Sequence, residues 1–245
     1  QQAWLARGDF VYQIEDLGTS MQRAETAAAV PGTGPVIVLD HYDNTASGGT
    51  MDTTEVLSAI LEAGLQRVAV FGFYDPDVVD QMAAAGVGAT VTVDLGGKLP
   101  MPALSEQSQP IRLTGEVKLL SNGKFQAKVA MARGLTINMG RSAVLSVGSV
   151  DIAIISRHIE PYDPECFRSL GMEPTSYDYV MLKSRIHYRV GFRDTAKEVI
   201  ECAGRGVCTS DYSQLTFDKV RRPVFPLDED GSGSNEFWQI PDVNA

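Results

Sequence analysis

The sequence predicts an α/β fold in which a small parallel layer is followed by an antiparallel β part and a mixed C-terminal segment. Two patterns support this. Between residues 35 and 95, short apolar runs alternate with stretches of helical periodicity. From residue 111, apolar and polar residues alternate with a period of two, which is typical of half-buried strands. With 245 residues, 44% of them hydrophobic, the chain is long enough to bury a full core.

The parallel layer is expected to run strand, helix, strand, helix, strand, with the elements at 36–39, 52–63, 67–73, 76–85 and 89–95. Gly64 and Gly86 follow the two helices, where C-terminal glycines belong, and Pro76 falls in a first turn. Asp52 and Glu55 are spaced as a capping box that would start the first helix at residue 52. Strands separated by helices imply right-handed crossovers and parallel pairing.

The antiparallel part is expected at residues 111–158, as an antiparallel sheet or partial barrel packed on the parallel layer. Its turn signals are Ser-Asn-Gly at 121–123, Asn-Met-Gly-Arg at 138–141 and Gly-Ser-Val-Asp at 148–151. The chain then becomes mixed, and the predicted elements are a helix at 164–170, a strand at 178–183 and a helix at about 189–203.

Composition shifts divide the chain into five segments. They are a helical linker at 1–33, the α/β layer at 34–105, the antiparallel part at 106–160, a closing segment at 161–228 and a tail at 229–245. A Pro/Gly cluster ends the linker, and the composition of the tail predicts disorder. The apolar face of the linker is expected to be exposed or covered by a neighbouring molecule, so an oligomer is possible.

Charge and cysteine content limit the partners and the compartment. A net charge of −10 opposes phosphate backbones and anionic lipid, so nucleic-acid and membrane partners are not expected. No apolar run approaches the roughly 20 residues that a membrane helix needs. Three cysteines without a C-x-x-C pair predict reduced thiols in a cytoplasmic protein.

The loop after the first predicted strand carries the first group of candidate site residues. Ligands gather beyond the carboxyl ends of parallel strands, and this loop lies at such an end. Its candidates are Asp40, Asp43, Asn44, Gly48 and Gly49. The polar three could bind a metal, a substrate amine or hydroxyls, or could order the loop through Asx turns. The two glycines could cradle an anion before a helix start, although a tight turn fits them better.

The second group is Lys183, Arg185 and His187, which follow the strand predicted at 178–183. Such cations in an acidic chain need a partner, either a substrate carboxylate or the loop at 40–44. The alternative is a solvated basic strand end. A Ser184–His187 nucleophile lacks the glycine elbow. The histidines have no metal-ligand spacing, so no metal site is expected within this chain, and the catalytic residues are unknown.

Several motifs resemble the C-terminal half of MlrC-type, microcystinase C-like zinc metallopeptidases. They are D-x-x-D-N-x-x-x-G-G-x-x-D-T-T at 40–54 and the stretches 86–92, 95–98, 183–189 and 221–228, and the resemblance covers about residues 34–228. Proteins of that family are longer, and their Asp and His metal ligands belong to an N-terminal half that this sequence lacks. The resemblance implies a zinc cofactor bound mainly by that half, which would be this chain's partner, and a small peptide or amide substrate.

Two functions from different classes follow. The first is the C-terminal domain of an MlrC-like metallohydrolase that cleaves peptide or amide bonds. This domain would supply substrate-positioning residues and a cleft wall, and would be inactive alone. The second is a stand-alone binding or assembly module. In the first case the loop at 40–44 should meet the segment 183–189 at the edge of a cleft, and neither Asp43 nor Arg185 should fill the core.

Overall fold

The computed structural model describes residues 2–228 and contains one large mixed sheet. The tail predicted to be disordered, 229–245, lies outside the described residues. The strands are β1 (Val36–Asp40), β2 (Val68–Tyr74), β3 (Thr90–Leu95), β4 (Ile111–Ser121), β5 (Lys124–Gln126), β6 (Thr136–Asn138), β7 (Ser142–Val147), β8 (Val150–Ile155), β9 (Tyr179–Leu182) and β10 (Glu198–Cys202). The helices are α1 (Gln2–Leu5), α2 (Leu17–Ala29), α3 (Glu55–Glu62), α4 (Pro76–Ala85), α5 (Glu165–Arg168) and α6 (Arg189–Phe192), with short 3-10 turns between them.

The eight strands of the large sheet follow the order β10-β1-β9-β2-β8-β7-β4-β3. The first five are parallel to one another, and the pairs β8–β7, β7–β4 and β4–β3 are antiparallel. Strands β5 and β6 form a separate antiparallel pair. The predicted α/β class, with a parallel part followed by an antiparallel part, is therefore confirmed.

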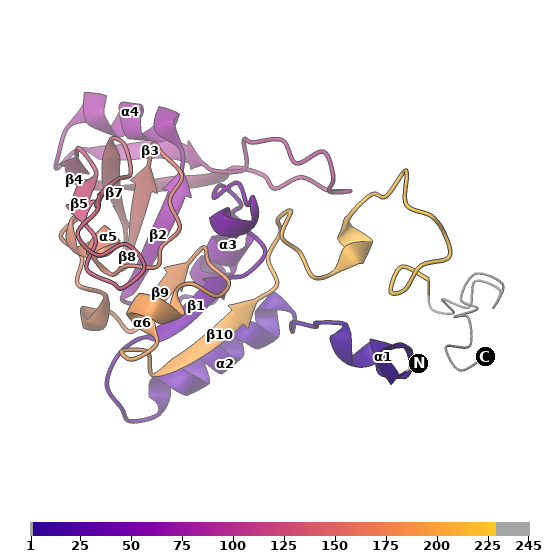
Figure 1. Cartoon of the computed structure of the whole chain (residues 1–245). Coiled ribbons are helices and arrows are strands. Elements are labelled where there is room, and N and C mark those ends of the chain that lie inside the picture. The colour runs from indigo at the N-terminus through magenta and orange to yellow at the C-terminus, as the bar shows by residue number, and fades with distance from the viewer. Residues whose placement is uncertain (1, 229–245) are drawn as a thin grey trace, which may run out of the picture.

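Helices and loops cover both faces of the sheet, as parallel strands require (Figure 1). Helices α2, α3 and α4 bury their apolar stripes against one face, together with Val38 and Val70. The next residues along the same strands, Leu39 and Phe71, point to the other face, which α5, α6 and the β5–β6 pair cover. This alternation places a core on each side of the sheet.

The predicted ends of helix α4 are confirmed. It runs Pro76–Ala85, and the Asp75 carboxylate caps it by accepting from the Val78 amide at 3.3 Å. Gly86 follows it with a φ of 86°, a conformation that glycine adopts readily. The capping box is wrong, however. Helix α3 begins at Glu55 rather than residue 52, and no described side chain caps it.

Other expectations about single elements are also wrong. Among the described strands β3 pairs with β4 alone, and that pairing is antiparallel, so β3 does not extend the parallel layer. The antiparallel strands are not packed on that layer but continue it edge to edge through β8. The turn at 121–123 does not form a hairpin, because β4 pairs with β7 and β5 with β6. The turn at 148–149 does join a hairpin, β7–β8.

The helix expected at about 189–203 is largely replaced by a strand. Helix α6 ends at Phe192, and Glu198–Cys202 forms β10, which pairs in parallel with β1 from Val36↔Glu198 to Asp40↔Cys202. Over so few residues, the spacing of the apolar side chains fits both the helical period of 3.6 and the strand period of two. Pairing with β1 satisfies the backbone N–H and C=O groups of residues 198–202 on the side that faces β1.

The N-terminal segment is helical, as expected, and much of it lies away from the sheet. Helix α1 and the segment after β10 extend toward the same side of the molecule (Figure 1). The Arg7 guanidinium lies 5.4 Å from the centre of the Phe225 ring, which links the two segments. Among residues 2–228, no helix combines the length and apolar character that a membrane crossing requires.

The strand assignment of β10 leads to a stability prediction. Ile200 is fully buried, whereas Val190, which the helical pattern would place on the same apolar face, is 42% exposed. Ile200→Ala should lower the free energy of unfolding by about 2–5 kcal/mol, because it leaves a cavity. Val190→Ala, the control, should change it by less than about 0.5 kcal/mol. Urea unfolding measures both, and equal losses at the two positions would contradict the strand.

Candidate functional site

The carboxyl edge of the parallel strands brings the two groups of candidate residues together. Strand β1 ends at Asp40 and strand β9 ends at Leu182, one residue before Lys183. The two strands are neighbours, with Leu39 paired to Leu182. The predicted meeting of the loop at 40–44 with the segment 183–189 therefore occurs, because adjacent parallel strands end at the same edge.

The two segments meet through a buried ion cluster. Lys183 Nζ lies 2.6 Å from Asp40 Oδ2 and 2.9 Å from Asp43 Oδ2, and all three side chains are fully buried. The ammonium also donates to the Thr53 carbonyl at 2.7 Å and lies 4.6 Å from the centre of the Phe73 ring. The expectation that Asp43 would not fill the core is wrong, because its carboxylate is part of this buried cluster.

Asp43 also fixes the loop that leads to helix α3. Its Oδ1 accepts from the Met51 amide at 2.8 Å, and its Oδ2 accepts from the Thr53 amide at 3.1 Å and the Thr53 hydroxyl at 2.9 Å. The Thr50 hydroxyl donates to Oδ1 at 3.3 Å as well, so the carboxylate has five contacts, counting Lys183, and is well satisfied. The Asp40 carboxylate is less well served, since its Oδ1 is buried without a hydrogen-bond partner among the described residues.

The pKa directions follow these environments. Burial raises the pKa of Asp40 to about 6, against the opposing pull of Lys183. Burial also acts to raise the pKa of Asp43, but the Lys183 ammonium and the amide donors outweigh it and hold that pKa below its usual range. For Lys183, burial favours the neutral amine, yet the two carboxylates outweigh burial and raise its pKa. The cluster therefore holds a charged lysine, an ionised Asp43 and a weaker acid in Asp40.

This geometry leaves no room for a metal ion between the two aspartates. The Lys183 ammonium occupies the position that a cation bridging Asp40 and Asp43 would take. Within residues 2–228, no three His, Cys, Asp or Glu side chains come together as a metal site. Asp40 and Asp43, as the structure places them, therefore do not fit a bound zinc ion.

Asn44, Gly48 and Gly49 order the loop itself. The Asn44 side chain accepts from the Ala46 amide at 3.2 Å, and its backbone carbonyl accepts from the Gly49 amide at 2.9 Å. Gly48 has a φ of 93°. A Cβ on Gly49 would lie 2.6 Å from the Asp43 carbonyl carbon, so only glycine fits there. The Asx-turn alternative is thus present for Asn44, and the tight-turn alternative holds for the glycines.

Asp52 and Glu55, which do not form the predicted capping box, anchor the neighbouring loop instead. Asp52 Oδ2 accepts from the amides of Lys98 at 2.8 Å and Leu99 at 2.7 Å. Glu55 accepts from the Ser108 hydroxyl at 3.0 Å and pairs with Arg205 at 3.1 Å. These contacts tie residues 96–108 to the start of helix α3.

The rest of the basic segment turns away from the buried cluster. Arg185 donates to the Cys208 carbonyl at 3.3 Å and to the Ser210 hydroxyl at 3.0 Å, so it holds the segment after β10. His187 Nδ1 lies 2.6 Å from Glu160 Oε2. Ser184 is buried and donates to Glu160 at 2.9 Å rather than to His187. A Ser–His nucleophile is therefore absent at Ser184.

Sequence reasoning missed two residues of this edge, Glu160 and Thr53. Glu160 lies in the loop after β8, whose carboxyl end faces the same side as those of β1 and β9. The strand-end argument that selected Asp40 would have selected Glu160 as well, had β8 been predicted to join the parallel strands. Thr53 contributes a carbonyl and a hydroxyl, and no sequence signal marks a backbone carbonyl as a ligand.

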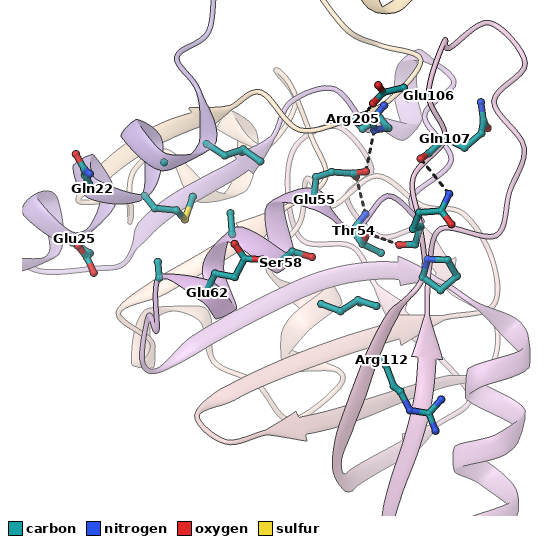
Figure 2. Close-up of a pocket in the computed structure, with 18 residues that line it drawn as sticks. Gln22, Glu25, Thr54, Glu55, Ser58, Glu62, Glu106, Gln107, Arg112 and Arg205 are labelled. Atoms are coloured by element: carbon teal, nitrogen blue, oxygen red, sulfur yellow. Dashed lines mark hydrogen bonds and ion pairs between the residues drawn. The ribbon is translucent and has the colours of Figure 1, made fainter.

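An open groove of about 980 Å³ runs beside helices α2 and α3 and the chain at 106–112 (Figure 2). Its charged side chains are Glu25, Glu55, Glu62, Glu106, Arg112 and Arg205. Figure 2 shows Arg205 between Glu55 and Glu106, which it reaches at 3.1 and 2.8 Å. None of the candidate site residues predicted from the sequence lines this groove. Arg205, the cation beside α3, is already paired with Glu55 and Glu106. The groove is therefore not the site that the sequence predicts.

The buried cluster leads to a prediction for Lys183→Met. Removing the ammonium leaves two buried carboxylates facing each other, and should lower the free energy of unfolding by about 3–5 kcal/mol. Arg112→Met is the matched control. It breaks an ion pair with Asp94 in which both side chains are more than half exposed, and should cost less than about 1 kcal/mol. Denaturant unfolding at neutral pH compares them, and a loss for Lys183→Met no larger than the control would contradict a structural role.

His41 gives a pH-dependent prediction. Its ring is buried, stacks on Tyr12 with centroids 5.4 Å apart, and has an Nδ1 without a described partner. Burial, with Arg185 and Arg189, lowers its pKa from 6.5 to about 4. Between pH 6.5 and about pH 4, His41 therefore stays neutral in the folded chain, whereas in the unfolded chain it takes up a proton. The resulting stability is fully present above pH 6.5 and is lost as the pH falls toward 4.

His41→Phe keeps the aromatic stack and removes this titration. The unfolding free energy of wild type should therefore fall relative to that of the variant between pH 7 and about pH 4. Urea unfolding of both proteins across this range measures the difference. A constant difference would show that His41 titrates alike in both states.

Comparisons with known proteins agree with this fold. Microcystinase C from Sphingomonas sp is 29% identical over 195 residues, which cover 79% of this chain and 36% of that protein. The crystal structure of a "Putative metallopeptidase" from Mesorhizobium sp. BNC1 shares the fold, with a TM-score of 0.78 at 24% identity over 92% of this chain and 43% of that one. The chain spans less than half the length of these two relatives. The family described as MlrC C-terminus matches residues 38–219, and the chain belongs to that family.

Proposed function

We propose that this chain is the C-terminal domain of a metal-dependent hydrolase that cleaves peptide or amide bonds. The observation that carries this proposal is the carboxyl edge of the parallel strands. There the buried Lys183 cluster anchors the glycine-rich loop through Asp43, and His187 stands partly exposed beside it. In parallel sheets this edge is where ligands bind. The names of the two relatives, a microcystinase and a metallopeptidase, support hydrolysis as the reaction.

In this proposal the metal is zinc, and its ligands lie outside this chain, in the N-terminal part of a longer protein. Two observations support that placement. Asp40 and Asp43 are occupied by Lys183, and residues 2–228 bring no other ligand set together. The present chain then supplies one wall of the substrate site, with Arg185, His187 and the loop at 44–49 as positioning groups for a small peptide or amide.

The exposed apolar side chains of the N-terminal segment support a covering partner. Leu5 is 74% exposed and Phe10 is 76% exposed, on a segment that extends away from the sheet (Figure 1). Leaving them in water forgoes the free energy of burial. We propose that the N-terminal part of the same protein covers them. The net charge of −10 disfavours nucleic acid and membrane as partners, and three buried free cysteines support a cytoplasmic location.

The test compares this chain with the product of the complete gene that contains it. Plasma emission measures zinc, and mass spectrometry follows the hydrolysis of linear peptides, cyclic peptides and simple amides. The complete product should hydrolyse at least one class, lose that activity with a chelator and regain it with Zn²⁺. The chain alone should hold no stoichiometric zinc and be inactive.

Microcystinase C from Sphingomonas sp serves as the positive control for the assay. One tightly bound zinc per isolated chain would contradict the placement of the metal. A complete, zinc-loaded product without hydrolysis would overturn the enzyme proposal and favour the alternative, a binding or assembly module.

A further inference from the structure

His187 and Glu160 form a pair whose geometry is fixed from the protein interior. Glu160 Oε1 accepts from the buried Ser184 hydroxyl at 2.9 Å, and Glu160 Oε2 lies 2.6 Å from His187 Nδ1. The Glu160 side chain is itself almost fully buried. The carboxylate therefore has little freedom to move, and it holds the imidazole at a set angle above the carboxyl edge of the sheet.

This pairing decides which nitrogen of His187 is available for chemistry. Nδ1 donates its proton to the carboxylate, since a carboxylate can only accept. Nε2 is then the free nitrogen, and no described residue hydrogen-bonds it. The side chain is 46% exposed, so a ligand can reach it. Because Nδ1 is fixed on the carboxylate, a proton carried on Nε2 faces the exposed side of the ring, where it can be given to a ligand.

His158, at the same edge, shows the contrast. Its Nε2 lies 3.0 Å from the Thr50 carbonyl, and its ring stacks on Tyr74 with centroids 3.8 Å apart. That nitrogen is engaged with the backbone and fixes the loop. His187 has its fixing contact on Nδ1 and leaves Nε2 unused.

We propose that His187 is the general acid of amide hydrolysis and that Glu160 positions it. The proposal rests on the proposed function. When the C–N bond of the tetrahedral intermediate breaks, its electron pair moves to the nitrogen, which takes the Nε2 proton and leaves as an amine. The C=O bond re-forms from the oxyanion, and His187 becomes neutral. The carboxylic acid product returns its proton to Nε2 and leaves as a carboxylate. The proton that water releases when the oxyanion forms passes through solvent to the free amine, so that amide and water give a carboxylate and an ammonium ion.

The experiment uses the complete gene product and two substrates with the same acyl group. One is an alkylamide, whose leaving amine needs a proton. The other is a p-nitrophenyl ester, whose phenolate leaves without one. His187→Asn keeps a donor near the Nδ1 position and removes Nε2. It should lower kcat for the amide by about 10²–10⁴-fold, with KM nearly unchanged, while kcat for the ester stays within about tenfold.

Glu160 is tested as a positioning residue. Glu160→Gln should show the same selective loss for the amide, and Glu160→Asp should recover part of it. Glu173→Gln is the matched control, because that carboxylate is exposed and pairs with Arg168 away from His187. Its activity should equal that of wild type. Thermal melts confirm that each variant is folded.

The outcomes separate the two proposals. Equal losses for amide and ester in His187→Asn would show a structural role and overturn the general-acid proposal alone. Full amide activity in His187→Asn would do the same. A wild-type product that hydrolyses neither substrate would overturn the proposed function, and the role of His187 with it.

Discussion

Burial of the Lys183 ammonium between two carboxylates is the constraint on which the carboxyl edge of the sheet depends. The cluster joins the end of β1, the end of β9 and the residues before helix α3. Each charge is too costly to bury alone, and each is held by the others. The three segments can therefore take their places only together. The cluster places the two ends of the loop at 44–49 and the start of the basic segment, and the hydrogen bonds of Asn44 then order the loop between those ends.

The sequence was sufficient to predict that these segments meet, because the reasoning used only the direction of strands. Residues that follow parallel strands lie at one edge, and opposite charges there attract. The burial of the cluster could not be predicted in the same way. Asp43 and Lys183 have charged side chains, which are usually exposed. Their burial depends on contacts with Thr53 and with the Phe73 ring, which are distant from Lys183 in the sequence. A position just after a strand predicts which residues lie close together, but it does not predict whether their side chains are buried.

The wrong predictions share a cause, which is competition between distant segments for the same partners. The stretch at 189–203 has apolar residues at helical spacing, yet β1 offers a row of backbone groups that β10 fills. Strand β3 is rich in valine, as a covered strand would be, but Thr90 and Thr92 on its polar side are typical of an edge strand with one face in water. The parallel pairing of β8 with β2, which are far apart in the sequence, was not predicted either. For that reason Glu160, in the loop after β8, was not selected as a candidate.

The parallel half of the sheet also determines the order in which the strands can pair during synthesis and folding. The β7–β8 hairpin closes across residues 148 and 149, so it needs only local chain. In contrast, β1 pairs with β9 and with β10, and Val36 finds its partners at Tyr179 and Glu198. During synthesis both edges of β1 therefore stay unpaired until residues 179–202 have been made, and they are open to other strands until then. The carboxyl edge, where we place the chemistry, is therefore complete only once β10, the last strand along residues 2–228, has been synthesised.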